Sequence, residues 1–174
     1  EKTASIAPSA GAPPRVTKVA TATGLSGDGS YYKSHIDLTI THQGTGLGEF
    51  ATRFKLPPGA WVQDYYLVID GKKVPGILAE RKSALWIYQQ IRNARRDPGI
   101  IYYTSADELI LRVFPVTEGE PRQTGFELIH REPLAFELDG TRIDLKVKPL
   151  PLAVQGQRDG DDNFVVVSAV GKAA

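Results

Sequence analysis

The side chains that could do chemistry in this sequence are three histidines, scattered serines and several carboxylates. The histidines are His35, His42 and His130. No two of them have the four-residue spacing that places two zinc ligands on one face of a helix. We therefore expect His35 and His130 to be solvated strand residues. The alternative, one metal site that joins all three, depends on the fold.

No serine lies in a sequence that is typical of a catalytic nucleophile. The stretch from Gly24 to Gly29 contains Ser26 but lacks the Gly-x-Ser-x-Gly order of a nucleophile elbow. No Gly-Lys-Ser/Thr follows it, so it does not resemble a phosphate-binding loop either. We predict no catalytic residues. A hydrolase whose residues converge only in the folded chain remains an alternative.

The carboxylates and the absence of cysteine give little support to a metal site. The chain has no cysteine, which excludes disulfides, thiolate metal ligands and cysteine nucleophiles. The acidic run from Asp159 to Asn163 could bind calcium through oxygen atoms. It lacks the residue order and the closing glutamate of an EF-hand loop, so we favour a plain acidic loop. We predict no metal ion and no cofactor.

A basic helix is the strongest candidate binding element. Residues 79–96 have helical apolar spacing, and Asp97-Pro98-Gly99 ends the pattern. Basic side chains near aromatic rings bind polyanions such as acidic polysaccharides. A helix face that is only solvated is the more common interpretation. The candidate binding patch comprises Arg92, Arg95, Arg96, Tyr102 and Tyr103.

The composition indicates one globular domain. The chain has 174 residues, of which 41% are hydrophobic and 24% charged, enough to bury a core without disulfides. Its formal net charge of +1 gives no overall attraction to nucleic acid. No apolar run is long enough to span a bilayer, so we expect membrane contact only through segments outside this chain. Residues 1–15 are predicted to be a flexible leader or linker, and residues 16–170 a single domain.

Alternation of apolar and polar residues is the dominant pattern and predicts strands. Ile36, Leu38 and Ile40 alternate with polar residues, as a half-buried strand requires. Asp70-Gly71 and Asp139-Gly140 lie between apolar runs and predict two tight hairpins. Further strands are predicted at Phe50–Phe54, Leu109–Val116, Phe126–Ile129 and Phe164–Val170. We expect about eight to ten strands in a mainly β fold: an antiparallel β-sandwich with one inserted α-helix at about residues 79–96.

Three aromatic residues precede the first Asp-Gly turn. Tyr65 alternates in phase with Leu67 and Ile69, which favours core packing for Trp61, Tyr65 and Tyr66. The alternative is an exposed aromatic patch that contacts a partner.

Residues 54–131 resemble the VIT domain, the module named for vault and inter-α-trypsin inhibitor proteins. The motifs that carry the resemblance are F-x-L-P-x-G-A-x-V from Phe54, Y-x-V-I-x-G from Tyr66, G-I-L-x-E-R-x-x-A-x-x-x-Y from Gly76, R-D-P-G from Arg96 and L-x-V-F-P-V from Leu111. The fold-signature residues are Pro57, Gly59, Ala60, Glu80, Ala84, Tyr88, Pro98 and Pro115.

The resemblance implies a non-catalytic scaffold or binding module. In many members of this family a von Willebrand A domain with a metal-ion site follows, but the D-x-S-x-S motif of that site is absent from this chain. Some bacterial members resemble membrane-anchored envelope proteins of exosortase sorting systems. We therefore expect a protein-interaction module of a larger bacterial envelope protein, periplasmic or surface-exposed, with a protein partner and no nucleic acid. A carbohydrate- or polyanion-binding module that uses the basic helix is the alternative.

Overall fold

The chain is almost entirely β-structure where the computed structural model describes it, at residues 12–79, 86, 89, 90, 99–150, 153–158 and 165–168. This confirms the predicted mainly β, antiparallel fold. The strands of the described residues are β1 (Arg15–Leu25), β2 (Tyr32–Thr41), β3 (Leu47–Lys55), β4 (Trp61–Ile69), β5 (Lys72–Pro75), β6 (Ile77–Ala79), β7 (Gly99–Tyr103), β8 (Glu108–Thr117), β9 (Arg122–His130), β10 (Leu134–Leu138), β11 (Thr141–Leu145), β12 (Ala153–Arg158) and β13 (Val165–Ser168).

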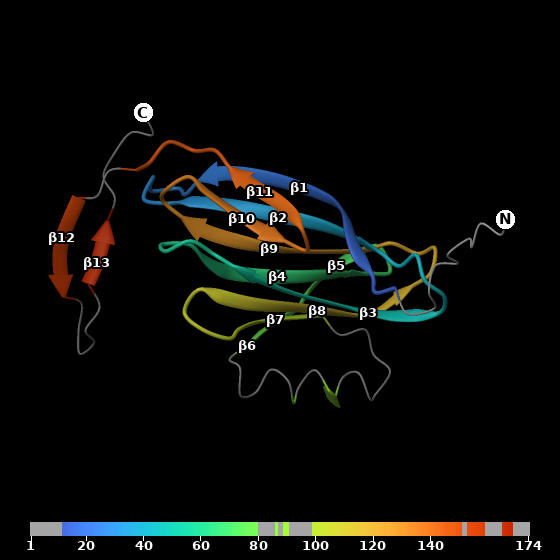
Figure 1. Cartoon of the computed structure of the whole chain (residues 1–174). Helices are drawn as coiled ribbons and strands as arrows, with labels where there is room; N and C mark the ends of the chain where they lie inside the picture. The colour runs from blue at the N-terminus through green and yellow to red at the C-terminus, as the bar shows by residue number, and fades with distance from the viewer. Residues whose placement is uncertain are drawn as a thin grey trace.

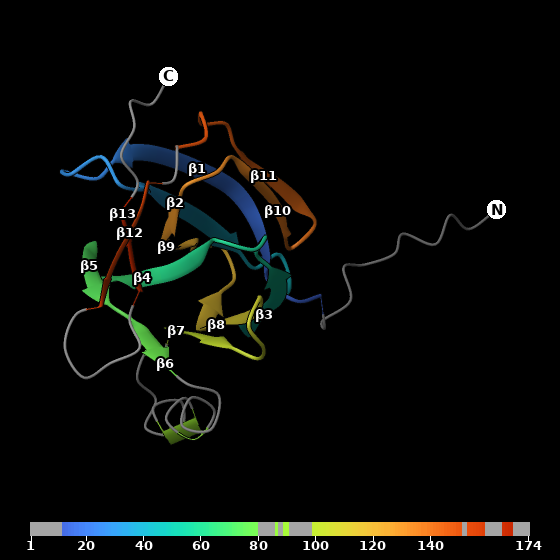
Figure 2. The same ribbon diagram turned by 90° about the vertical axis from the view of Figure 1, so that its left-hand side faces the viewer.

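Two sheets form the body of the molecule. One has the strand order β1-β2-β9-β4-β5 and the other has the order β3-β8-β7-β6. Figures 1 and 2 show the four-stranded sheet lying beneath the five-stranded one. Neighbouring strands in both sheets are antiparallel except β6 and β7, which run parallel. The pairs β10-β11 and β12-β13 form two separate ladders.

The core lies between the two sheets and is rich in aromatic rings. Phe54 of β3 stacks on Phe126 of β9, with ring centroids 5.5 Å apart, which joins one sheet to the other. Phe136 of β10 lies 5.9 Å from Phe54, so the β10-β11 hairpin closes the same core. Full burial of each such side chain contributes about 1.5–3 kcal/mol.

Both predicted Asp-Gly hairpins are present. Asp70 and Gly71 connect β4 to β5 with φ angles of 51° and 74°, and Asp139 and Gly140 connect β10 to β11 with 49° and 75°. Two consecutive residues with positive φ define the tight turn whose twist matches the flanking strands.

The structure differs from the sequence-based expectation in strand number and at the start of the helix. Thirteen strands occur among the described residues, more than the eight to ten expected. Ala79, the predicted first residue of the helix, instead ends β6 and pairs with Tyr102. Trp86, Gln89 and Gln90 are helical, while the remaining predicted helical residues and the acidic run 159–163 lie outside the described residues. No helix in the described part of the chain is both long and apolar enough to cross a membrane.

Tyr65 lies where the chain passes from one sheet to the other. It is 3% exposed, and its ring fits against two glycines, Gly76 between β5 and β6 and Gly99 at the start of β7. A Cβ atom at Gly76 would overlap ring carbons of Tyr65, and one at Gly99 would overlap the tyrosine hydroxyl. These two positions therefore require glycine for close packing.

We predict that Gly76→Ala destabilises the fold by about 1–3 kcal/mol, because the added methyl displaces a buried ring that has no free space to enter. Urea unfolding followed by fluorescence measures the loss. Gly24→Ala is the matched control, because a Cβ there meets no atom within 4 Å. Equal stability of the two variants would contradict the packing role of Gly76.

Candidate functional site

A histidine and a serine meet inside the sandwich. His130 at the end of β9 is 1% exposed and Ser34 of β2 is fully buried. Ser34 Oγ lies 2.6 Å from His130 Nε2. His130 Nδ1 donates to the backbone carbonyl of Glu132 at 2.8 Å, and because a carbonyl can only accept, Nδ1 carries the ring hydrogen. Ser34 therefore donates to Nε2 of a neutral imidazole.

The prediction that His130 is a solvated strand residue is wrong. Its side chain points in the same direction as those of Leu128 and Phe126, which lie two and four residues earlier on the strand and are both buried. The alternating pattern of β9 thus contained the signal for its burial. Burial lowers the pKa of His130, although its bond to the Glu132 carbonyl opposes this effect.

In the Ser34–His130 pair the serine hydroxyl donates to the imidazole, as a nucleophilic serine does to its general base. Thr23 Oγ1 of β1 lies 2.7 Å from Ser34 Oγ, so the pair joins β1, β2 and β9. Neither Ser34 nor His130 lines the four surface hollows at Lys73, Gln123, Gly140 and Gln43, and both side chains are almost completely buried. Because both side chains are buried, we interpret these hydrogen bonds as structural contacts between neighbouring strands.

The outer face of the five-stranded sheet carries the accessible polar groups. Strands β2, β9 and β4 place His35 beside Glu127, and Glu127 beside Asp64, in one row across the sheet. His35 Nε2 lies 3.4 Å from Glu127 Oε2. Asp64 is exposed, and its carboxylate has no hydrogen bond or ion pair with another described residue. His35 is exposed, as predicted.

Tyr66 and Gly125 form the next row of this face. Asp37 and Tyr66 both lie opposite Gly125, and the Tyr66 hydroxyl donates to an Asp37 carboxylate oxygen across it. A Cβ at Gly125 would lie 2.6 Å from both the Tyr66 hydroxyl and the Ile36 carbonyl oxygen, so only glycine lets the ring cross β9. Partial burial and the bond to Asp37 raise the pKa of Tyr66.

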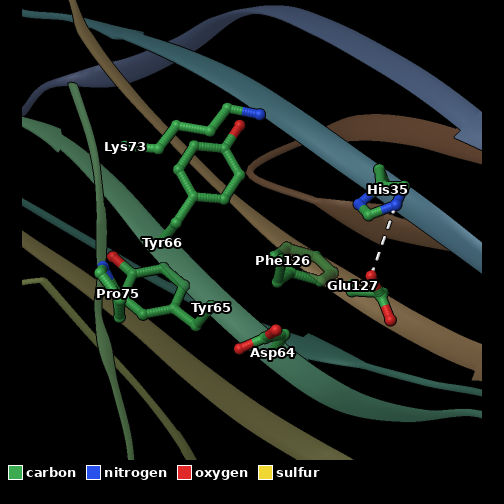
Figure 3. A pocket seen from close by; sticks show the side chains of 8 residues that line it. All are labelled: His35, Asp64, Tyr65, Tyr66, Lys73, Pro75, Phe126 and Glu127. Carbon is green, nitrogen blue, oxygen red and sulfur yellow. Dashed lines mark ion pairs between the residues drawn. The ribbon is translucent and has the colours of Figure 1, made fainter. Parts of the chain in front are cut away.

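Lys73 of β5 covers the Tyr66 ring. Its ammonium lies 4.5 Å from the ring centroid, a favourable cation–π contact. Figure 3 shows Lys73 and the Tyr66 hydroxyl together at one end of the site, with Asp64, Glu127 and His35 away from them.

A hollow of about 250 Å³ lies between these groups. Its residues are His35, Asp64, Tyr65, Tyr66, Lys73, Pro75, Phe126 and Glu127. Tyr66 and Pro75 supply apolar surface, and the carboxylates and His35 supply polar groups. The residues that line the hollow include no serine, threonine or cysteine.

Trp61 stands beside the hollow on the outer face. It is 52% exposed and pairs with Ile129 of β9, one row beyond the row of Glu127 and Asp64. We predicted that all three aromatic residues pack in the core. This prediction is confirmed for Tyr65 and wrong for Trp61, and Tyr66 is half-buried. A β-bulge between Val62 and Asp64 is the reason, because it shifts the alternation after Trp61.

The two tyrosines of the predicted basic patch lie inward. Tyr102 is 2% exposed and its hydroxyl accepts from Arg112 Nε at 3.3 Å. The half-buried Tyr103 accepts from the Val62 backbone N–H at 2.9 Å. Tyr102 therefore offers almost no surface to a ligand. Arg92, Arg95 and Arg96 lie outside the described residues.

His42 does not join the other histidines. It is 5% exposed, and its ring lies close to Gly44 and Gly48, where a Cβ atom would crowd it. Among the described residues, no group of three or more histidine, aspartate or glutamate side chains is placed to hold a metal ion.

The two packed sheets and the hollowed outer face define a β-rich sandwich module. The model of the VIT family, the Vault protein inter-alpha-trypsin domain, matches residues 28–128. The match covers more than half of the chain, so the chain belongs to the VIT family. It begins ahead of the predicted region 54–131 and includes all of β2 and β3.

The relatives are much longer proteins. The chain is 25% identical over 120 residues to inter-alpha-trypsin inhibitor heavy chain H4 of Sus scrofa, and 26% identical over 120 residues to that of Bos taurus. Each alignment covers 69% of this chain but only 13% of the relative's length. The solved chitin-binding domain of a Pyrococcus furiosus chitinase covers 79% of this chain and 100% of its own, with 15% identity and a TM-score of 0.32, too low to bear on fold or function.

We predict that acid weakens the fold through His130. Burial holds its pKa below the ordinary value of 6.5, so the folded protein binds this proton less readily than the unfolded chain does. The stabilisation that needs neutral His130 is present above pH 6.5 and is lost as the pH falls through the lower folded pKa. Melting temperatures measured at several pH values should fall more steeply in acid for the wild type than for His130→Gln.

His35→Gln, on the exposed outer face, is the control for this experiment and should keep the wild-type loss in acid. If His130→Gln leaves the pH dependence unchanged, the burial of a neutral His130 does not control acid stability.

Proposed function

We propose that this chain is a non-catalytic protein-interaction module within a larger bacterial envelope protein, exposed in the periplasm or at the cell surface. Membership of the VIT family together with one surface feature carries the proposal: Trp61 stands 52% exposed beside a hollow on the outer sheet face. The relatives support the placement within a larger protein, because the chain spans only 13% of their length.

The physical reason for choosing this face is the cost of exposing a large aromatic side chain. An exposed Trp leaves apolar area in water that a partner could bury, and Trp, Tyr and Arg dominate the binding energy of protein interfaces. Tyr66 is held rigidly by Asp37, Gly125 and Lys73, so it loses little conformational entropy on binding. Rigid aromatics surrounded by polar groups are typical of an interface centre.

The two alternatives have less support. A polyanion site on the basic helix would depend on Arg92, Arg95 and Arg96, because Tyr102 is buried. A hydrolase built on Ser34 and His130 would need a path to two buried side chains.

The envelope assignment predicts the size and location of the native protein. Immunoblotting of fractionated source cells with antiserum to this chain should give a membrane-fraction band far above 19.0 kDa. A single band near 19.0 kDa in the soluble fraction would contradict both the larger protein and its anchoring.

The interaction itself is tested by photo-crosslinking in the same cells. With a benzophenone amino acid in place of Trp61 in the full-length protein, we expect a discrete crosslinked adduct, because the probe lies at the centre of the interface. Lys55, exposed on β3 of the other sheet, is the control position and should give no such adduct. Absence of an adduct from position 61, or identical adducts from both positions, would overturn the proposal that a partner binds the outer face of the five-stranded sheet.

A further inference from the structure

We propose that the hollow beside Tyr66 receives an arginine side chain of the protein partner, with its guanidinium group between Asp64 and Glu127. This inference rests on the proposed function and names the chemistry by which the partner is recognised.

The size of the hollow suits one side chain. Pockets for drug-sized molecules have volumes of roughly 300–1,000 Å³, and this hollow of about 250 Å³ lies below that range. Its apolar walls include the half-buried ring of Tyr66 and the side chain of Pro75, whereas the Tyr65 ring is buried in the core. Flat apolar walls of this kind pack well against the stem and the planar head of an arginine.

The charges of the hollow favour a cation. Asp64 and Glu127 are direct cross-strand partners, so their Cβ atoms lie about 4.5–5.5 Å apart and two like charges face each other. The Asp64 carboxylate has no hydrogen bond or ion pair with another described residue, and the contact of Glu127 with His35 is an ion pair only when the imidazole is protonated. A bound cation would relieve this repulsion and bind both carboxylates.

The ammonium group of Lys73 does not neutralise the two carboxylates. It lies over the ring of Tyr66, and Figure 3 shows it beside the Tyr66 hydroxyl, apart from Asp64 and Glu127. The hollow thus has a cationic end, where Lys73 is engaged with Tyr66, and an anionic end with the exposed Asp64 and the mostly buried Glu127. An anionic ligand would meet the two carboxylates, which excludes a polyanion from this site.

Arginine fits the anionic end better than lysine. Its guanidinium has five N–H donors in a plane and can bond two carboxylates at once while its face lies on an aromatic ring. Trp61, one row further along β4, offers a second exposed ring to the same partner segment. A lysine ammonium is more strongly hydrated and has no flat face to stack.

The test uses a neutral analogue of arginine as its main control. Acetyl-Gly-Arg-Gly-amide is titrated into the uniformly ¹⁵N-labelled full chain, and amide and indole chemical shifts are followed. We expect saturable shifts centred on Asp64, Glu127 and the Trp61 indole. Acetyl-Gly-citrulline-Gly-amide, of nearly equal shape but without charge, should leave these signals in place.

Variants locate the charge contacts. Asp64→Asn and Glu127→Gln should each weaken binding of the arginine peptide by about tenfold, the effect of losing one hydrogen bond to a charged group. Asp144→Asn, on the exposed side of β11, should bind like the wild type. The spectrum of each free variant also reports whether it is folded.

Three results would overturn the inference: no saturable shift, equal binding of the citrulline peptide, or full binding by the double variant Asp64→Asn/Glu127→Gln. If the arginine peptide fails while crosslinking at Trp61 succeeds, the partner uses the outer face without an arginine in the hollow. If crosslinking at Trp61 fails while the peptide binds, the hollow accepts arginine but this face is not the partner interface.

Discussion

The contact of Tyr65 with Gly76 and Gly99 is the constraint on which the arrangement of the two sheets depends. Tyr65 belongs to the five-stranded sheet, whereas Gly76 precedes β6 and Gly99 begins β7 of the four-stranded sheet. The Gly76 N–H donates to the Tyr65 carbonyl at 2.9 Å, and Thr124 Oγ1 of β9 lies 2.9 Å from the Tyr65 hydroxyl. Burial raises the pKa of this tyrosine, so it remains neutral inside the protein. The Tyr65 side chain therefore positions two segments of the four-stranded sheet: Gly76, where the chain enters it before β6, and Gly99, where β7 begins.

The parts of this fold that follow from local chemistry could be predicted from the sequence. Asp70-Gly71 and Asp139-Gly140 adopt positive φ at both residues, a property of the two residue types themselves. The alternation of β2 also gave the correct buried face. Strand β1 could not be predicted in this way, because residues Ala20–Leu25 are all exposed at the edge of the sheet and no apolar alternation is needed there.

The candidate site could not be predicted, because no local spacing connects its members. His35, Glu127 and Asp64 come from three strands and meet only through the β2-β9-β4 pairing. The bulge between Val62 and Asp64 also changes which residues of β4 face the core. Val62 and Tyr65 are both buried although they are three residues apart, whereas simple alternation would place them on opposite faces. Local sequence pointed instead to the basic helix, where a charge excess is visible without any knowledge of the fold.

The two histidines of β2 and β9 differ in their access to solvent. His130 has a serine at hydrogen-bonding distance but is sealed in the interior, where it is most stable as a neutral group. His35 is open to solvent and faces a carboxylate, yet no serine, threonine or cysteine lines the hollow beside it. The paired nucleophile and base are thus on the inside of the sheet, and the reachable charges are on the outside. The outer surface thus combines an exposed Trp61 with two opposed carboxylates, Asp64 and the mostly buried Glu127, and it is this combination that the proposed partner would contact.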